Sequence, residues 1–561
     1  MKRRNLLRKT FLFIIAFFFG YTVKKEGEDM LLQRVDSTTY RHKDLMLISE
    51  EIKNLREKSE DTAIDLSERG INVKKFGAKG DGVTDDTLAV KNAIKNVGPY
   101  STIYFPKGVY IINNLTINDS IHFIGVGGDV IFKRTLNNII LSTTITVKNI
   151  ELENITFDGD SIKKTGVSVS FHKLFIKKCT FKNCGIPGYK AGNMSNVDGM
   201  RISGIEADIS NCLFNRNERD GLFGSAVETL RVSNCKFNDN GRFASANDGG
   251  NATKYFPKNT IYMNNYVNNC GSGGLHVEGL NKSTFYSKVV FVGNIIDNCG
   301  GDSWGFGWGI VAGINTEGTA SGNIITNFNL NNNPSLSAFP ISTKIGEWSI
   351  NGNSFRKCKG IVINSNQSGV DYPLVITGNS FKDCGTALNI YQHHNVVFTA
   401  NRTEKMELHG LNVDFCDNTI INGNIILNSS DSSRGEFSGV YLSRATFPTV
   451  TGNIINGMKQ KYGIEIPEGT DTTNINFGLN HINSFVTAWS NIAEGSSQGY
   501  SINQKRIFYA TTIPTTGKFL KGDIIYNTNP FASGKIGWIC IAAGKFGNTD
   551  PIFKLFGEID P

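Results

Sequence analysis

The sequence predicts an all-β fold, a single-stranded parallel β-helix of about 12 turns with a helix capping its N-terminal end. Two periodic sequence motifs and the spacing of the cysteines indicate this fold. The first motif is Asn-x-Phe or Asn-Ile-Ile, usually after Gly, as at Asn294, Asn323 and Asn353. With its degenerate copies from Ile155 to Asn480, it recurs at steps of 22 to 33 residues. Such a period is typical of solenoids, and the shortest steps leave room for three short strands and their turns.

A second motif recurs within the repeats. In it, Gly or a polar residue precedes alternating apolar positions, as in Gly199-Met200-Arg201-Ile202. Because side chains alternate across a strand, one set should face inward and the next should stack on an outer face. The expected inward set is Met200, Leu275, Ile310, Ile361, Leu411 and Ile464. The expected outward set is Arg201, His276, Val311, Val362, Asn412 and Glu465. This period of two argues against a helical solenoid.

The cysteines keep the same register. Of the ten, three stand at repeat starts (Cys179, Cys212 and Cys235), and five more stand five residues after a start. This spacing predicts stacked interior residues, with Cys416 and Cys540 off the register. A disulfide framework or zinc site is not expected, since no Cys-x-x-Cys pair occurs.

The N-terminal region lies outside the repeats. Basic residues, among them Arg3 and Arg4, precede an uncharged apolar run from Phe11 to Val23, which is the order of a secretory signal. The run is shorter than the roughly 20 residues that span a bilayer, and no Ala-x-Ala site follows it. Residues 1–23 are therefore predicted to be a cleaved signal or a retained membrane anchor, the chain's only membrane contact.

Two further regions flank the repeats, which occupy residues 71–495. Residues 24–70 are charged, and the spacing of Leu45, Ile48, Ile52 and Leu55 predicts a helical or coiled linker. Residues 496–561 contain segments with a β-strand pattern and are predicted to form a small β module, either a cap or a ligand-binding unit. The net charge of +8 comes without a basic, aromatic-interleaved stripe, so a nucleic-acid partner is not expected.

A Gly-rich motif precedes the repeats, Phe76-Gly-Ala-Lys-Gly-Asp-Gly-Val-Thr-Asp-Asp-Thr87, and Tyr104-Phe-Pro-Lys-Gly-Val-Tyr110 follows it. Between them we expect a helix with Thr84 or Asp85 as N-cap and carboxylates in its first turn. Its apolar side is suited to closing the end of a β-helix, and comprises Leu88, Ala89, Ala93 and Ile94.

On these motifs the chain resembles the pectate-lyase-like superfamily over roughly residues 71–490, in particular the branch of rhamnogalacturonase- and epimerase-like proteins and phage tailspikes. The resemblance implies a right-handed β-helix that acts on polysaccharides from an outward sheet face. It also implies that Asp81, Asp85 and Asp86 are cap residues. A calcium loop is not expected because the closing Glu of an EF-hand is absent.

Long repeats locate a candidate groove. Extra residues occur at four places, namely 185–197, 241–260, 300–307 and 327–344. Stacked insertions on neighbouring turns form walls, and loops often carry function. Trp304, Trp308 and Tyr255 are expected to stack on sugar rings, although packing of loops onto the body is an equal alternative.

Candidate catalytic residues lie in the same zone. Asn196-Val197-Asp198-Gly199 is similar to the Asn-Thr-Asp-Gly motif of polygalacturonases, and Asp220 follows Asp198 by 22 residues. Adjacent turns stack about 4.8 Å apart, so these two carboxylates should lie side by side and divide acid and base or nucleophile roles.

The sequence departs from the polygalacturonase pattern around this pair. Arg219 replaces the second aspartate of the family's pair, and His276 with Glu278 is a displaced substitute for its histidine motif. Ordinary Asp-Gly turns are the alternative interpretation of the aspartate pair.

Two classes of function remain. The first is an exported or envelope-associated enzyme that cleaves an acidic or cell-envelope polysaccharide. As a hydrolase it implies no cofactor, and as a lyase it would use Arg201 or Arg219 as base, with Ca²⁺ held by Asp198, Asp220 or Asp248. The second is a glycan-binding prophage tailspike on a virion, which would be a homotrimer. In both classes Arg201 is expected to contact the polysaccharide.

Overall fold

The computed structural model of the chain describes residues 21–26, 29–34, 70–186, 196–249, 255–279, 286–300, 308–328, 339–341, 345–364, 372–431, 435–467, 476–478, 480–484, 487–489, 500–502, 505–515 and 518–561. Two compact units are present, Met1–Arg69 and Gly70–Pro561. No helix among the described residues is long and apolar enough to cross a membrane.

The first unit contains a hairpin of β1 (Tyr21–Glu26) and β2 (Asp29–Arg34), paired antiparallel. The structure thus differs from the helix predicted for 24–70 over these residues. The remainder of that linker, including the leucine-rich seam, and residues 1–20 of the predicted signal or anchor lie outside the described residues.

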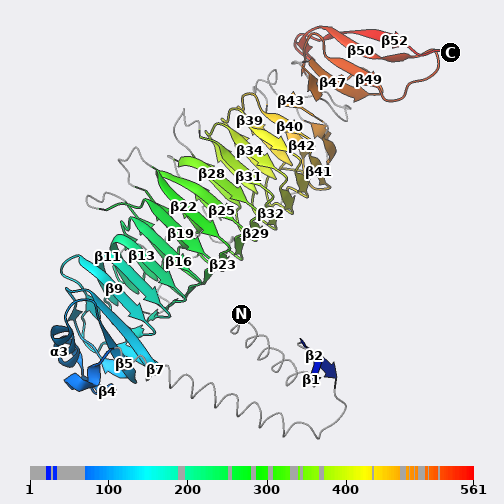
Figure 1. Ribbon diagram of the computed structural model, residues 1–561. Coiled ribbons are helices and arrows are strands. Elements are labelled where there is room, and N and C mark those ends of the chain that lie inside the picture. The colour runs from blue at the N-terminus through cyan, green and yellow to red at the C-terminus, as the bar shows by residue number, and fades with distance from the viewer. Residues whose placement is uncertain are drawn as a thin grey trace. The chain divides into compact units, whose positions relative to one another are not determined.

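In the second unit, strands β3 to β45 are hydrogen-bonded in three parallel sheets that repeat once per turn (Figure 1). This repeating arrangement confirms the predicted β-helix. Sheet A consists of β6 (Leu115–Thr116), β8 (Leu141–Ser142), the first halves of β11 (Val167–Lys177) and β13 (Met200–Ser210), then β15 (Leu222–Ser225), β18 (Phe243–Asp248), β21 (Gly273–Glu278), β24 (Trp308–Ala312), β27 (Phe339–Ile341), β30 (Ile361–Asn364), β33 (Leu388–Tyr391), β36 (Leu411–Asp414), β39 (Val440–Ser443), β42 (Tyr462–Glu465) and β45 (Thr487–Trp489).

Sheet B consists of β3 (Ile71–Asn72), the first halves of β5 (Ser101–Ile111) and β7 (Ile121–Lys133), β9 (Val147–Glu153), the second halves of β11 and β13, then β16 (Thr229–Ser233), β19 (Asn259–Met263), β22 (Ser287–Val292), β25 (Thr316–Ser321), β28 (Ile345–Asn351), β31 (Leu374–Thr377), β34 (Val396–Thr399), β37 (Ile420–Asn422), β40 (Thr449–Thr451) and β43 (Asn476–Phe477).

Sheet C consists of β4 (Asp81–Asp85), the second halves of β5 and β7, then β10 (Thr156–Asp158), β12 (Thr180–Lys182), β14 (Leu213–Asn215), β17 (Lys236–Asn238), β20 (Tyr266–Asn268), β23 (Ile295–Asp297), β26 (Ile324–Thr326), β29 (Ser354–Arg356), β32 (Ser380–Lys382), β35 (Arg402–Glu404), β38 (Ile425–Leu427), β41 (Ile454–Gly457) and β44 (His481–Ser484).

The repeating Asn forms a buried ladder at the corner between sheets B and C. From Asn265 to Asn480, each side-chain amide donates to the next asparagine's Oδ1 at 2.9–3.2 Å. For the ladder positions from Asn265 to Asn453, the preceding residue has positive φ, for example Gly322 at 62° and Asn264 at 55°. Glycine and asparagine tolerate this conformation, which explains the recurring Gly-Asn pair.

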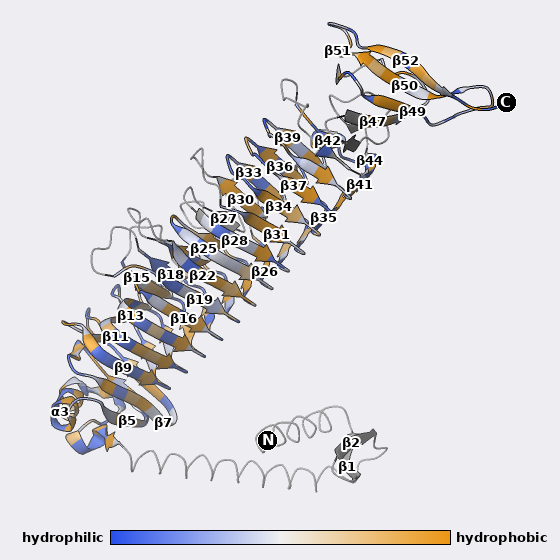
Figure 2. Cartoon of the chain, turned by 45° about the horizontal axis from the view of Figure 1, so that its top comes forward, coloured by the Kyte–Doolittle hydropathy of each residue, from blue (hydrophilic) through white to orange (hydrophobic). Residues whose placement is uncertain are grey.

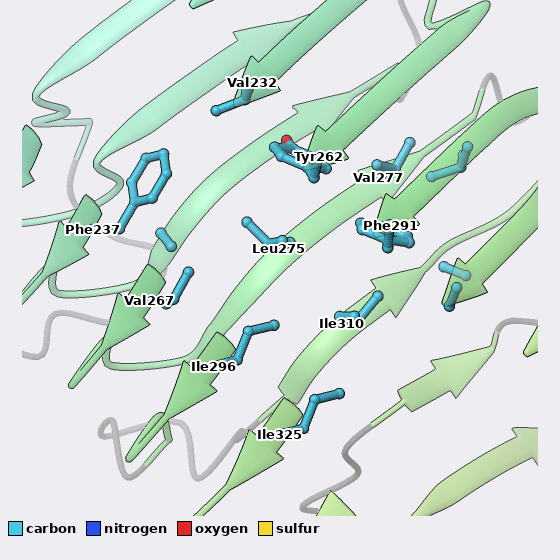
Figure 3. Packing of buried hydrophobic residues seen from close by; sticks show 14 of the residues in the cluster. Val232, Phe237, Tyr262, Val267, Leu275, Val277, Phe291, Ile296, Ile310 and Ile325 are labelled. Atoms are coloured by element: carbon cyan, nitrogen blue, oxygen red, sulfur yellow. The ribbon is translucent and has the colours of Figure 1, made fainter. Parts of the chain in front are cut away.

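The interior is apolar, and polar and apolar residues alternate along the strands (Figure 2). All six residues predicted to face inward are buried, and Leu275 and Ile310 are seen inside the solenoid in Figure 3. Phe157, Phe181, Phe214 and Phe237 stack with centroids 4.8–5.0 Å apart. All ten cysteines are buried and free, so the interior prediction holds for the eight in register and extends to Cys416 and Cys540.

Helix α3 (Thr87–Val97) packs Val90 and Ala93 into the first turns of the core. Its N-cap is Asp86, one residue beyond the predicted Asp85 and two beyond Thr84, so no carboxylate lies in its first turn. The Asp86 carboxylate instead accepts from the backbone N–H groups of Lys79 and Gly80, at 2.6 and 3.0 Å. Leu88 is 69% exposed, in contrast to its predicted place on the apolar side. A 3-10 turn, η1 (Val73–Phe76), precedes this region.

The C-terminal strands form a separate five-stranded sheet, consisting of β46 (Tyr500–Ile502), β47 (Lys505–Ala510), β49 (Ile524–Asn527), β50 (Lys535–Ala542) and β52 (Ile552–Glu558). A short pair, β48 (Lys518–Phe519) and β51 (Gly544–Lys545), accompanies it. Its buried residues include Phe508, Phe519 and Ile525.

Replacing Asn323 with Ala should lower the free energy of unfolding by about 3 kcal/mol, because it leaves buried donors and acceptors without partners. The Asn323 side chain accepts from Asn294 and donates to Asn353 and to the Phe291 carbonyl. Denaturant unfolding measures the loss. The control is Asn259→Ala, at an exposed position at the start of β19, which should change stability by less than about 0.5 kcal/mol. Equal losses in both variants would contradict a stabilising ladder.

Candidate functional site

The outer face of sheet A between β13 and β24 carries the predicted site residues. One outward row runs through Arg201, Phe223, Ala246, His276 and Val311, which are register partners on successive turns. The long connections predicted as groove walls enter or leave strands of this sheet, and part of each lies outside the described residues.

Asp198 and Asp220 lie on adjacent turns, each two residues before the strand that follows it, as their spacing predicts. The Asp220 N–H donates to Asp198 Oδ1 at 3.4 Å. Both carboxylates are fully buried, with 0% exposure. They therefore lie beneath the surface and do not project into solvent.

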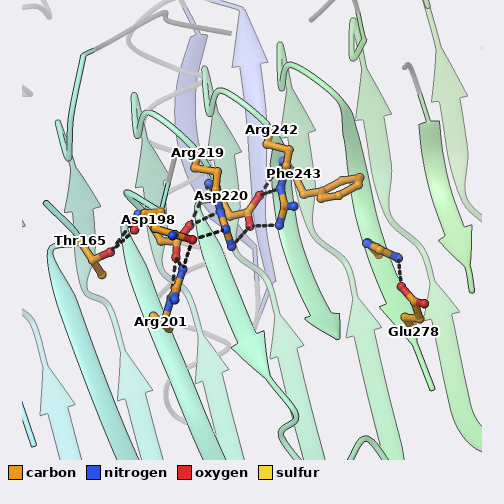
Figure 4. A network of polar contacts seen from close by, with 10 residues as sticks. Thr165, Asp198, Arg201, Arg219, Asp220, Arg242, Phe243 and Glu278 are labelled. Atoms are coloured by element: carbon orange, nitrogen blue, oxygen red, sulfur yellow. Dashed lines mark hydrogen bonds and ion pairs between the residues drawn. The ribbon is translucent and has the colours of Figure 1, made fainter. Parts of the chain in front are cut away.

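Three arginines surround this pair (Figure 4). Asp198 is 2.8 Å from Arg219 Nε and 2.8 Å from the Arg201 guanidinium. Asp220 lies 3.1 Å from Arg219, and Arg242 contacts both of its oxygens at 2.8 and 2.5 Å. The network thus has three guanidinium groups for two carboxylates, so it carries a net positive charge when both aspartates are ionised.

Phe223 lies under all three arginines, with guanidinium-to-centroid distances of 5.0 Å for Arg201, 4.5 Å for Arg219 and 5.7 Å for Arg242. Such cation–π contacts fix the guanidinium planes. The side chain of Arg201 is 32% exposed, while that of Arg219 is only 7% exposed. Of these two, Arg201 is the one that can reach a ligand.

Burial raises the pKa of Asp198, and the neighbouring Asp220 adds to this effect against Arg219 and Arg201. For Asp220, burial alone would raise the pKa, but Arg242 and Arg219 outweigh it and lower the pKa. The pKa values of the two carboxyl groups are thus shifted in opposite directions, the pattern that allows one group to act as acid and the other as base. Their full burial nevertheless keeps them from direct contact with a ligand on the surface.

A second titratable cluster lies two turns further along the face. His276 Nε2 is 3.8 Å from Glu278 Oε2, and Asp248 is the register partner of Glu278 on the neighbouring strand β18. Burial, followed by the charge of Asp248, raises the pKa of Glu278 to about 7. Burial lowers the pKa of His276 to about 4. At neutral pH the histidine is uncharged, and a large fraction of Glu278 is protonated.

Aromatic rings lie beside this cluster. Phe243 stacks on Trp308 with centroids 6.1 Å apart and lies 4.7 Å from the His276 ring. Trp308 is half-buried at the start of β24, and Tyr255 is half-buried in the connection after β18. The predicted Trp304 lies outside the described residues.

A basic cavity of about 300 Å³ adjoins Arg201. It is lined by Ile139, Lys163, Lys164, Thr165, Ser168, Asn196, Val197 and Arg201. Three of these residues are cationic and none is acidic. Thr165 Oγ1 donates to the Asn196 carbonyl and accepts from the Asp198 N–H, which links the cavity to the arginine network.

Calcium does not fit Asp198 or Asp220, two of the three aspartates that a lyase mechanism would assign to it. The oxygens of Asp198 and Asp220 are engaged by guanidinium groups, and a calcium ion needs six or more oxygen ligands. Within the described ranges, no group of three or more His, Cys, Asp or Glu residues could hold a metal ion.

Sequence reasoning did not identify two members of the site. Arg242, which binds Asp220, follows no recognisable motif. It lies one turn after Arg219, and its backbone N–H donates to the Arg219 carbonyl. The sequence suggests Asp248 only as a calcium ligand. Its pairing with Glu278 is not evident there, because the register depends on the lengths of the intervening turns. Matching β18 to β21 residue by residue would have paired them.

Two family descriptions match the chain. Residues 70–301 match "Rhamnogalacturonase A/epimerase, pectate lyase-like", and residues 341–505 match "Right handed beta helix region". The first match contains the Gly-rich motif and every candidate site residue up to Glu278.

Curated relatives are similar over part of their length. The K30/K69-specific capsule depolymerase of Klebsiella phage K64-1 is 26% identical, covering 40% of this chain and 30% of that protein. The pre-neck appendage protein of Bacillus phage phi29 is 24% identical, covering 38% and 28%. Alginate lyase 7 of Azotobacter vinelandii is 27% identical, covering 37% and 23%. The chain thus spans less than a third of the length of these relatives.

Among solved structures, tailspike protein 3 of bacteriophage CBA120 matches with a TM-score of 0.38 and 11% identity, covering 98% of this chain and 76% of that one. The N-terminal fragment of bacteriophage phi29 gene product 12 matches with a TM-score of 0.38 and 15% identity, covering 90% and 76%.

Proposed function

Because the chain belongs to the pectate-lyase-like superfamily of right-handed parallel β-helix proteins, we propose that it binds a polysaccharide on the outer face of sheet A and cleaves its glycosidic bonds. The observation that carries the proposal is the pairing of Glu278 with Asp248 on neighbouring strands. Glycoside hydrolysis uses two carboxyl groups, one of them protonated at the working pH.

Glu278 is the general acid in this proposal. Its side chain is 27% exposed, so it can reach a glycosidic oxygen, and its pKa of about 7 keeps a proton available at neutral pH. Asp248 is the second carboxylate and acts as base or nucleophile. Neutral His276 lies 3.8 Å from the Glu278 carboxyl group and forms one side of its surroundings.

Asp198, Asp220 and Arg219 then have a positioning role. Their buried network holds Phe223 and Arg201 in place, two and three turns before Glu278. Arg201, with Lys163 and Lys164 of the basic cavity, favours an acidic sugar. Trp308, which stacks on the Phe243 ring that lies against His276, supplies an apolar face on which a sugar ring can stack.

A polysaccharide panel tests the proposal. The purified full chain is incubated with alginate, polygalacturonate, Klebsiella K30 capsular polysaccharide and neutral dextran, each with and without chelator. New reducing ends without ultraviolet absorbance of unsaturated sugars support hydrolysis. Unsaturated ends would show a lyase and would move the base to Arg201 or Arg219. No cleavage of any polymer would overturn the proposed enzyme.

Cleavage should fall as pH rises through about 7, because Glu278 loses the proton that it must donate. The raised pKa sets the sign, since the active form is fully populated below it and depleted above it. Initial rates from pH 5 to 9 measure this limb. A rate that is constant up to pH 9 would contradict Glu278 as the acid.

A second candidate function is a phage appendage that binds a glycan without turnover. The similarity to a phage pre-neck appendage protein favours it. It places the chain on a virion or outside the cell, as a homotrimer. Light scattering that gives a trimer mass, together with retardation in polysaccharide gels and no cleavage, would select this candidate over the enzyme.

A further inference from the structure

The later turns of sheet A carry a second group of side chains on the same outer face. We name it the distal cluster and define it as His409, Phe437, Tyr441, Lys461 and Glu465. Tyr441 on β39 is the register partner of Asn412 on β36 and of Glu465 on β42.

The distal cluster lies in line with the site around Glu278. The outward row of His276 continues through Val311, β27, Val362, Asn389 and Asn412 to Tyr441. Six strand steps separate His276 from Tyr441, which corresponds to roughly 29 Å at ~4.8 Å per step. A linear ligand lying across the strands would therefore reach both groups.

The rings of the distal cluster are held in fixed positions. The His409 ring lies 4.6 Å from Tyr441 and 5.1 Å from Phe437, measured between centroids. Its Nδ1 accepts from the Ser438 N–H at 3.0 Å. Because burial lowers the pKa of His409 to about 4, the ring is neutral at pH 7 and its proton is on Nε2.

Charged groups flank the rings. The Ser438 hydroxyl donates to Glu465 Oε2 at 2.6 Å, and Lys461 Nζ lies 3.1 Å from Glu465 Oε1. Lys461 also lies over the Tyr462 ring at 5.1 Å. Phe437, Tyr441 and Lys461 are each partly exposed. The cluster thus offers aromatic faces together with hydrogen-bonding groups, the combination that suits a sugar with apolar C–H faces and hydroxyl edges.

We propose that the distal cluster is a second binding site for the same polysaccharide, so that the polymer lies along sheet A and is cleaved internally. This inference rests on the proposed function. It adds that the ligand is a long chain, because a short oligosaccharide cannot reach from Glu278 to Tyr441.

The test compares Tyr441→Ala with wild type, with Tyr266→Ala as the control. Tyr266 is an outward tyrosine of sheet C, 38% exposed. Affinity electrophoresis in gels of alginate, polygalacturonate, K30 capsular polysaccharide and dextran measures polymer binding, and the tetrasaccharide fraction of each is the short probe. Thermal melting confirms that all variants are folded.

Tyr441→Ala should weaken binding of the retarding polymer about five- to tenfold, the loss of one stacked ring. Cleavage of the tetrasaccharide should stay within about twofold of wild type, and Tyr441→Phe and Tyr266→Ala should bind the polymer like wild type. If Tyr441→Ala binds the polymer as tightly as wild type, the inference is overturned. It is also overturned if the variant loses tetrasaccharide cleavage by the same factor as polymer binding. Either result leaves the proposed function intact.

Two further outcomes have distinct meanings. A change in molar mass of Tyr441→Ala by light scattering overturns the inference, because the face would then be a contact between copies of the chain. Failure of wild type to bind or cleave every polymer overturns the inference and the proposed function together.

Discussion

Glu278→Gln should reduce polysaccharide cleavage by about 10²- to 10⁴-fold, the usual contribution of a positioned general acid. Glutamine keeps the shape of the side chain but has no proton to donate at the pKa of a carboxyl group. The variant should bind polymer as wild type does, since Arg201 and Trp308 are unchanged. Initial rates and affinity electrophoresis on the same polymer measure the two effects separately.

The matched control is Glu206→Gln, which removes an outward carboxylate of sheet B that pairs with Arg231 at 2.8 Å. It should leave the rate within about twofold of wild type, since surface ion pairs contribute little. The residual activity of Glu278→Gln should also lack the decline above pH 7. Full activity of Glu278→Gln would place the acid elsewhere on the face.

The regular part of the molecule could be predicted from sequence because each turn repeats the same physical demands. A buried asparagine at each corner must donate to the next, and the residue before it must adopt positive φ, so Gly-Asn recurs visibly. The same logic placed Met200 inside and Arg201 outside. Periodicity therefore indicated the core, the sheet faces and the interior cysteines.

The site was harder to predict because it depends on irregular turn lengths. Asp198 and Asp220 are separated by one short turn, and their adjacency follows from spacing alone. Their burial does not, since it requires Arg201, Arg219 and Arg242 to close over them. The pairing of Asp248 with Glu278 spans a longer turn whose extra residues shift the count. Sequence motifs located the face, and three-dimensional register assigned the partners.

Asp220→Asn should lower the free energy of unfolding by about 3–5 kcal/mol, because it leaves buried arginines without their counter-charge. Arg242 contacts both oxygens of Asp220, Arg219 lies at 3.1 Å, and the Phe243 N–H donates to Oδ1 at 3.0 Å. An asparagine accepts with only one oxygen, so part of this set is lost. Denaturant unfolding at pH 7 measures the change.

The control for this prediction is Asp160→Asn, which removes an exposed ion pair with Lys133 and should cost less than about 1 kcal/mol. The pKa of Asp220 is lowered in the folded protein, so its contribution is fully present above the pKa of the unfolded chain and disappears as pH falls through the folded value. The difference between wild type and Asp220→Asn should therefore shrink in acid. A double-mutant cycle with Arg242→Gln should give a coupling of about 1–3 kcal/mol. A stable Asp220→Asn variant that has nevertheless lost cleavage would favour a direct catalytic role for this aspartate over the positioning role proposed for it.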